Sequence, residues 1–274
     1  MSDQSDPLNR IAQALERLSP PASAPADWLG FPAYVWDGGA RAVGQIVAPA
    51  LDLLKGIDAQ KQAVTTNVTR LAQGHAAHDM LLWGARGMGK SALLRASIIA
   101  AQAKHGARIA LVQVSGDALP TLAALFTALG RVDRRFLVFI DDLGFEDGDG
   151  AGPRALRSWL EGGVEARPGN VRLAVTSNRR AIVARHAGEQ DDPLNPRDAV
   201  DDRLALADRF GLSIGFHNCT QDDYLAIIAG YCGNLGLAFA EADALEWAKR
   251  RGARSGRVAW HYVTELAGRA GRTI

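Results

Sequence analysis

The chain has 274 residues, of which 47% are hydrophobic and 22% charged, so it has ample material for a core and is not a disordered protein. With 31 Lys and Arg against 30 Asp and Glu, the formal net charge of +1 gives no support to a general nucleic-acid binder. The polar start and the lack of a long apolar run lead us to expect a cytoplasmic protein without a membrane span.

The first 40 residues form a segment distinct from the rest. Apolar residues at helical spacing in 8–18 are followed by closely placed prolines in 20–25 and by an aromatic tract in 28–36. We expect an N-terminal helical, proline-rich arm over 1–40. Its purpose stays open between a partner-binding or oligomerisation arm and a helix with a tether that packs on the body.

Short apolar runs alternate with helical stretches after a long helical pattern at 42–74. Several runs are almost continuously apolar, which is typical of parallel strands that are covered on both faces. Strands that alternate with helices predict βαβ units and a three-layer α/β domain, which we place at 41–217. The predicted strands are Met80–Trp83, Ile109–Val114, Phe136–Ile140, Val171–Thr176 and Leu212–Phe216.

A small helical domain is expected after the last predicted strand, over 218–274. Thr220–Asp223 resembles a capping box at a helix start, and the apolar residues that follow it lie on one helical face. Two further helices are predicted at 242–251 and 256–268. The chain has 2 cysteines, which are too few for a disulfide framework or, by themselves, for a tetrahedral metal site.

The segment 84–91 is a full G-x-x-x-x-G-K-[ST] motif, placed between a predicted strand and a helical run at 92–104. Its glycines let the backbone curl so that successive N–H groups face phosphates, and the following helix adds its positive N-terminal end. Lys90 is expected to reach the β- and γ-phosphates of ATP, and the Ser91 hydroxyl is expected to bind Mg²⁺. The predicted nucleotide-binding residues are Gly84, Ala85, Arg86, Gly87, Met88, Gly89, Lys90 and Ser91.

Two acidic residues follow the predicted strand at 136–140. A buried strand that ends in a carboxylate is how P-loop enzymes hold magnesium, so Asp141 is predicted on the metal side. Asp142 is predicted to orient or deprotonate the attacking water, or else to cap a helix. After the next strand, Asn178 is predicted to help position that water, although an asparagine there is most often a turn residue.

The order of these motifs resembles that of AAA+ ATPases. Five strings bring the chain closer to an uncharacterised bacterial ATP-binding family known as domain of unknown function 815, from about residue 40 to the C-terminus. This resemblance implies an AAA+-type P-loop NTPase fold with a C-terminal helical lid, and a nucleotide site between the α/β domain and the lid. The strings are LWGARG at 82–87, DDLGFE at 141–146, TSNRR at 176–180, ADRFGL at 207–212 and RGARSGR at 251–257.

The resemblance also implies roles for single residues. Asn178 matches the sensor-1 position, Arg257 matches sensor 2 at the start of a lid helix, and Ile57 lies where such proteins grip the adenine. Arg209 matches the arginine finger that reaches a neighbour's γ-phosphate, which implies head-to-tail contacts in a homo-oligomer. From the residues alone, Arg209 also fits a surface ion pair and Arg257 a solvated basic face.

The second acidic residue departs from the usual AAA+ pattern. AAA+ ATPases generally have Asp-Glu where this chain has Asp141 and Asp142, and the aspartate side chain is one methylene shorter. A displacement on the ångström scale can cost about 10²-fold in rate. The family that the chain resembles more closely also carries Asp-Asp, which leaves open that the site accommodates the shorter side chain, but we still expect slow ATP turnover.

Together, the motifs predict an ATPase that hydrolyses ATP with Mg²⁺ and uses the energy to remodel an unknown protein partner. The alternative is a slow or non-hydrolysing ATP-dependent switch or assembly module, for example a DNA-associated loader. A basic cluster in the helical domain motivates the DNA version, and a small-molecule kinase is a further alternative that the phosphate loop alone permits. The cluster consists of Lys249, Arg250, Arg251, Arg254 and Arg257.

Overall fold

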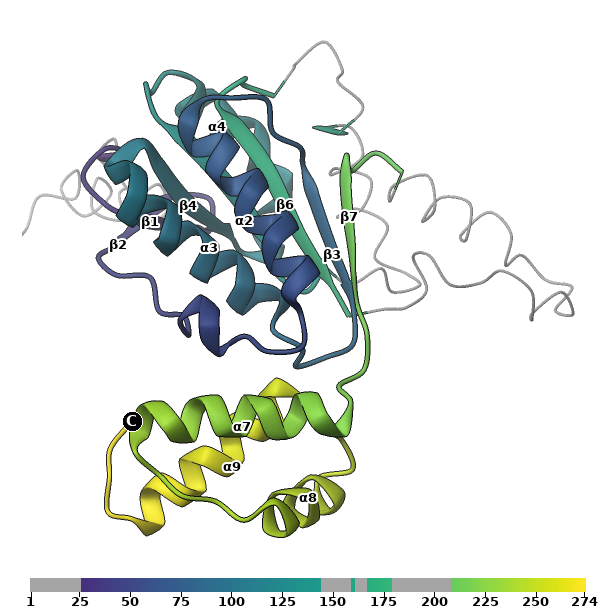
Figure 1. Cartoon of the computed structure of the whole chain (residues 1–274). Helices are drawn as coiled ribbons and strands as arrows, with labels where there is room; N and C mark the ends of the chain where they lie inside the picture. Colours follow the sequence, from purple (N-terminus) through teal and green to yellow (C-terminus); the bar gives the residue numbers. More distant parts are fainter. Residues whose placement is uncertain (1–25, 144–158, 161–166, 179–207) are drawn as a thin grey trace, which may run out of the picture.

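A computed structural model describes residues 26–143, 159–160, 167–178 and 208–274 of the chain (Figure 1). The helix expected at 8–18 lies outside these residues. Within the described ranges, no helix combines the length and the apolar composition needed to cross a membrane.

The described part of the α/β domain is built on a seven-stranded sheet with the order β2-β1-β4-β5-β6-β3-β7. β2 runs antiparallel to β1, and the other described pairs are parallel. All five predicted strands are present, and β3 lies between β6 and β7. The strands are β1 (Ala33–Trp36), β2 (Ala40–Val43), β3 (Met80–Gly84), β4 (Ile109–Val114), β5 (Arg135–Ile140), β6 (Val171–Ser177) and β7 (Leu212–Phe216).

The central strands are buried on both faces, as their almost continuous apolar sequences predict. Successive side chains of β5 point to opposite faces, so Leu137 and Phe139 pack on one side while Phe136 and Val138 pack on the other. α2 (Asp58–Gln73) and α3 (Lys90–His105) cover the first side, and α4 (Leu122–Gly130) covers the second. Three short 3₁₀ helices in the described chain complete this domain, namely η1 (Leu51–Leu53), η2 (Gly106–Arg108) and η3 (Gly116–Thr121).

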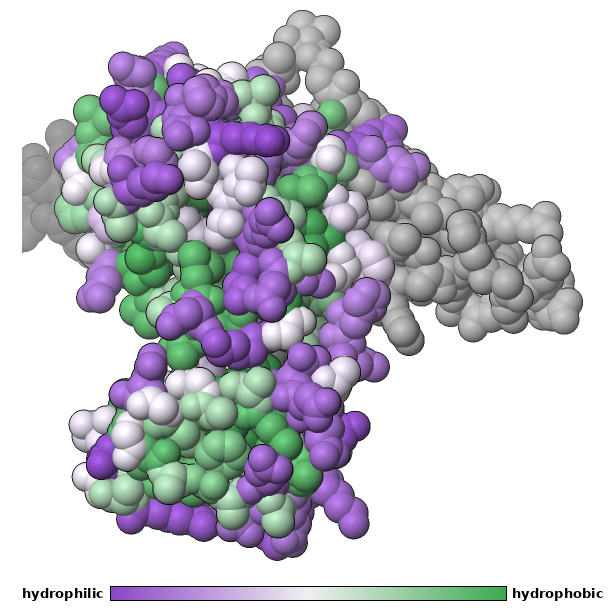
Figure 2. All heavy atoms as spheres, in the orientation of Figure 1, coloured by the Kyte–Doolittle hydropathy of each residue, from purple (hydrophilic) through white to green (hydrophobic). Residues whose placement is uncertain are grey.

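The lid follows β7 and consists, in the described chain, of α7 (Gln221–Leu235), α8 (Glu241–Arg250) and α9 (Gly256–Arg269) (Figure 1). The predicted capping box is present, since the Thr220 hydroxyl accepts the Asp223 N–H and the Asp223 carboxylate accepts the Thr220 N–H. Buried side chains of the lid continue the apolar cluster of the α/β domain. Figure 2 shows hydrophilic side chains over the upper part of the α/β domain and hydrophobic ones on the visible face of the lid around α7.

The N-terminal boundary that the sequence suggested at residue 40 runs through the β1–β2 hairpin. β1 pairs with β4, and Trp28, Tyr34 and Trp36 are buried in the core beneath α4. These aromatic residues of the tract at 28–36 are therefore part of the body, while the packing of the helix expected at 8–18 stays a prediction. Because β1 has only four residues and its partner β4 is far away in the sequence, local spacing did not reveal it.

The helical pattern expected from residue 42 to 74 holds only in its second half. The chain first completes β2, then forms η1, and α2 begins at Asp58. Gly56, just before α2, has a φ of +72°, which a continuous right-handed helix cannot contain.

Candidate functional site

The loop between β3 and α3 depends on glycine where two backbones approach closely. Gly84 has a φ of +117°, and a Cβ there would lie 2.2 Å from the Phe216 carbonyl oxygen of β7. The Ala85 N–H donates to the same oxygen at 2.8 Å. Gly89 has a left-handed φ of +88° at the point where α3 begins. The loop is thus held against β7 at one end and enters a helix at the other.

Lys90 is buried at the start of α3, with only 5% of its surface exposed. Its ammonium donates to the Gly84 and Ala85 carbonyl oxygens, both at 2.9 Å, and to Asn178 Oδ1 at 3.0 Å. Burial lowers the pKa of Lys90, and the two carboxylates that follow β5 act in the opposite direction. The ammonium therefore lies between the inside of the loop and Asn178, where phosphate oxygens could replace these acceptors.

Ser91, Asp141 and Thr176 form one hydrogen-bonded group at the carboxyl ends of β5 and β6. Asp141 Oδ1 accepts from Ser91 Oγ at 2.6 Å and from Thr176 Oγ1 at 2.7 Å. Thr176 Oγ1 in turn accepts the Asp142 N–H at 2.8 Å. Thr176 was not among the predicted site residues, although a hydroxyl near the carboxyl end of a mostly apolar strand was a usable signal.

Asp142 and Asn178 lie across the same end of the sheet. Asn178 Nδ2 donates to the Asp142 carboxylate, while Asn178 Oδ1 accepts from Lys90. The guanidinium of Arg86 lies 3.9 Å from the other Asp142 oxygen, and both of these side chains are exposed. The structure therefore brings together the predicted metal-side acid, the predicted water-activating acid and the predicted sensor residue around Lys90.

The oxygen atoms of Ser91 and Asp141 fit the predicted Mg²⁺ site. Hydroxyl and carboxylate oxygens are ligands that Mg²⁺ prefers, and here they already lie 2.6 Å apart. Mg²⁺ at nucleotide sites is commonly held by one or two protein oxygens together with phosphates, so no larger protein cage is needed. None is found in the described residues, where no group of three or more His, Cys, Asp or Glu is suited to hold a metal.

The lid meets the phosphate loop at the first turn of α9. The Arg257 N–H donates to the Gly87 carbonyl oxygen at 3.2 Å. The positive charge of Arg257 is close enough to Lys90 to be one of the smaller causes that lower the pKa of Lys90. Arg257 thus lies beside the phosphate loop, and its role as sensor 2 stays a prediction.

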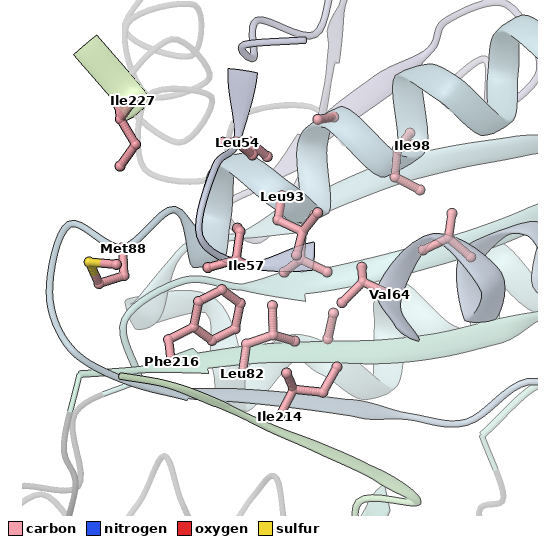
Figure 3. Packing of buried hydrophobic residues seen from close by; sticks show 14 of the residues in the cluster. Leu54, Ile57, Val64, Leu82, Met88, Leu93, Ile98, Ile214, Phe216 and Ile227 are labelled. Atoms are coloured by element: carbon pink, nitrogen blue, oxygen red, sulfur yellow. The ribbon is translucent and has the colours of Figure 1, made fainter. Parts of the chain in front are cut away.

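Ile57 lies beside the loop, at the start of α2. It is 4% exposed, and its Cδ1 would be 3.8 Å from a Cβ placed on Gly89. Ile57, Leu54 and Met88 belong to one apolar cluster, which Figure 3 shows together with Ile227 of α7. The position offers an apolar side chain next to the phosphate loop, and its contact with adenine remains a prediction.

Arg209 is the one predicted residue that the structure keeps away from this site. It precedes β7, whose residue Leu212 pairs with Met80 at the start of β3, whereas the phosphate loop follows Gly84 at the other end. Four residues of parallel strand span about 13 Å. Arg209 therefore lies beyond the amino-terminal ends of β3 and β7, whereas Lys90 of the same chain lies at their carboxyl ends.

Comparisons with known proteins identify the family of the chain. A family model described as "Protein of unknown function (DUF815)" matches residues 30–270. No curated protein matches the sequence.

Solved structures of AAA+ proteins share the fold at low sequence identity. The RuvB Holliday junction branch migration motor of Thermotoga maritima is 18% identical with a TM-score of 0.53, over 83% of this chain and 68% of that one. The Orc1 protein of Aeropyrum pernix, solved in complex with DNA, is 15% identical with a TM-score of 0.53, over 80% and 62%. Domain III of the T. maritima replication initiation protein DnaA is 13% identical with a TM-score of 0.50, over 84% and 89%.

Proposed function

Since the chain belongs to the DUF815 family and has the AAA+ P-loop fold, we propose that it binds ATP with Mg²⁺ and hydrolyses it. The energy would change the geometry of lid and subunits and so remodel a protein partner. The observation that carries the proposal is the hydrogen bond between Ser91 and Asp141, next to a buried Lys90 that donates to two carbonyl oxygens of the loop and to Asn178. This is the arrangement that a nucleotide phosphate chain with Mg²⁺ requires.

Each side chain of the group has a distinct task in this proposal. Lys90 exchanges carbonyl acceptors for phosphate oxygens, and Ser91 with Asp141 would hold Mg²⁺, which when bound neutralises charge on those oxygens. Asp142 accepts a proton from the attacking water. Asn178, which contacts both Lys90 and Asp142, keeps that water in line with the phosphate.

Arg209 completes the proposed site from a neighbouring subunit. Arg209 lies beyond the amino-terminal ends of the strands, too far to reach Lys90 of the same subunit. In a head-to-tail assembly, Arg209 of one subunit can instead lie at the phosphate loop of the next. A positive charge supplied in this way stabilises the transition state of phosphoryl transfer. We therefore propose a homo-oligomer in which each ATP lies between two subunits.

A second candidate is an ATP-dependent switch with slow turnover, and the geometry of Asp142 favours it. Its carboxylate is short, and Asn178 and Arg86 both approach it. An aspartate held in this way, with a side chain one methylene shorter than glutamate, is less free to move toward an attacking water. Turnover far below one per minute with tight ATP binding would support the switch.

The basic cluster of the lid gives a DNA partner only weak support. Arg250 pairs with Glu246, and Arg251 stacks on Trp247 with 4.8 Å between the guanidinium carbon and the ring centroid. Both arginines therefore already have neighbours within the lid. We propose a protein partner, and measurable ATP-dependent DNA binding in a filter assay would overturn that preference.

The central test replaces Lys90 with alanine and measures ATP binding by calorimetry and phosphate release by a colorimetric assay. We expect Lys90→Ala to abolish detectable turnover and to weaken ATP binding at least about 100-fold, because a charge-assisted contact to phosphate is lost. The matched control is Lys104→Ala, an exposed lysine in the last turn of the same helix. Unchanged binding and turnover in Lys90→Ala would refute the proposal.

A further inference from the structure

Two glycines mark a close backbone contact between the lid and the phosphate loop. A Cβ added to Gly87 would lie 2.8 Å from Ser255 Oγ, and a Cβ added to Gly256 would lie 3.1 Å from the Gly87 carbonyl oxygen. The Arg257 N–H donates to that same oxygen at 3.2 Å. The first turn of α9 and the Ser255 side chain therefore rest directly on the main chain of the phosphate loop.

Ser255 fixes where α9 begins at this contact. It is 7% exposed, and its hydroxyl accepts the Val258 N–H at 3.2 Å as the helix N-cap. The cap holds Gly256 and Arg257 in the first helical turn, which sets the direction of the Arg257 N–H toward Gly87. The start of α9 is thus fixed by a contact within the lid itself, without a nucleotide.

The contact constrains a peptide group of the loop. Gly87 has a φ of +73°, a conformation that glycine adopts easily, and none of the described peptide bonds is cis. In a trans peptide the C=O and the next N–H point in opposite directions. When α9 holds the Gly87 carbonyl oxygen, the Met88 N–H is therefore directed away from the lid, and N–H groups of this loop form the cradle for phosphates.

We infer that Ser255 and Gly256 are positioning residues that couple lid docking to nucleotide affinity through the Gly87–Met88 peptide. This inference rests on the proposed binding of ATP and concerns its regulation. The route is separate from the Arg257 guanidinium, because the hydrogen bond to Gly87 comes from the backbone N–H of residue 257. Coupling of this kind is reciprocal, so bound nucleotide must stabilise the lid contact by the same factor by which the contact raises nucleotide affinity.

The first test is Gly256→Ala in the full chain, compared with Gly268→Ala in the same helix. The new Cβ at position 256 pushes on the Gly87 carbonyl oxygen, whereas nothing lies within 4 Å of a Cβ at position 268. We expect Gly256→Ala to raise the Kd for MgADP and the KM for ATP by about tenfold, because the Gly87–Met88 peptide of the phosphate cradle must shift to make room for the new Cβ. The kcat and the melting temperature should match those of Gly268→Ala.

The second test uses the unmodified protein and follows backbone hydrogen exchange of residues 255–260 with and without MgADP. Slower exchange of the Arg257 amide in the bound state is expected, and unchanged exchange in a protein that calorimetry shows to be saturated would overturn the inference. An equal Kd in the two glycine variants would overturn it as well. Failure of the wild-type protein to bind MgADP at all would instead refute the proposed function.

Discussion

Asp142 combines an unusual backbone with a crowded carboxylate. Among the described residues other than glycine, Asp142 is the one with a positive φ, at +50°. Asn and Asp are the residues that tolerate this conformation best after glycine. Its N–H is held by Thr176 and its carboxylate by Asn178. The strained backbone is therefore stabilised by Thr176 of β6 and by Asn178 just after that strand, and it directs the Asp142 carboxylate toward the site.

This geometry makes Asp142→Asn a clean test of proton acceptance. Asparagine keeps the left-handed backbone, so folding and ATP binding should remain within about threefold of wild type, while kcat falls by about 10²–10⁴-fold because the general base is lost. Steady-state phosphate release and calorimetry measure the two quantities. The control is Asp133→Asn, at an exposed site just before β5, the strand that Asp142 follows. If Asp142→Asn has the same kcat as this control, Asp142 is not the base.

Within the lid, the packing of α7 buries two groups that ionise only at alkaline pH. Burial raises the pKa of the Cys219 thiol from 9.0 to about 11 and that of the Tyr224 hydroxyl from 10.0 to about 12. Tyr224 also donates to the Ala244 carbonyl oxygen of α8 at 3.2 Å, which ties two lid helices together. The folded lid therefore favours the protonated, uncharged forms of both groups.

The free energy of unfolding should therefore fall as the pH rises from about 9 to about 12. Both groups keep their protons longer in the folded state, so the stability they contribute is complete below their unfolded pKa values and is lost as pH passes through the folded ones. The expected loss is about 1–3 kcal/mol, measured by urea unfolding at a series of pH values. In Cys219→Ala the part of the slope between pH 9 and 11 should shrink, and an identical slope in both proteins would contradict this explanation.

For the whole molecule, the separation of Arg209 from Lys90 predicts that two inactive variants complement each other. Lys90→Ala lacks the phosphate contact and Arg209→Ala lacks the finger, so each alone should be inactive. After mixing in equal amounts, about a quarter of head-to-tail interfaces combine an intact loop with an intact finger, and activity should return accordingly. Phosphate release by the mixture measures this.

Subunit exchange must be allowed before the assay, for instance by dilution and reconcentration of the mixed proteins. Each variant kept separately under the same treatment is the control. A mixture no more active than these controls would mean that Arg209 does not serve a neighbour's site.

Much of the fold and the centre of the site follow from short sequence patterns. The phosphate loop at 84–91, the five apolar strands and the capping box at Thr220 depend on residues that are close in the chain, where glycine conformation, strand burial and side-chain capping act locally. Asp141, Asp142 and Asn178 could be predicted because parallel strands bring their carboxyl ends to one edge. The match to DUF815 over residues 30–270 agrees with these patterns.

Other features depend on contacts between distant segments, which no local period encodes. Only the folded sheet shows that β1 pairs with β4 and that Thr176 and Ser91 both donate to Oδ1 of Asp141. The same holds for the position of Arg209 at the end of the strands opposite to the phosphate loop. The contact between Gly87 and α9 is of the same kind, since either glycine alone has many explanations in sequence. The sequence by itself therefore determined which chemical groups the protein carries, and the tertiary structure decided which of them meet, because strand order and lid docking depend on the packing of the whole core.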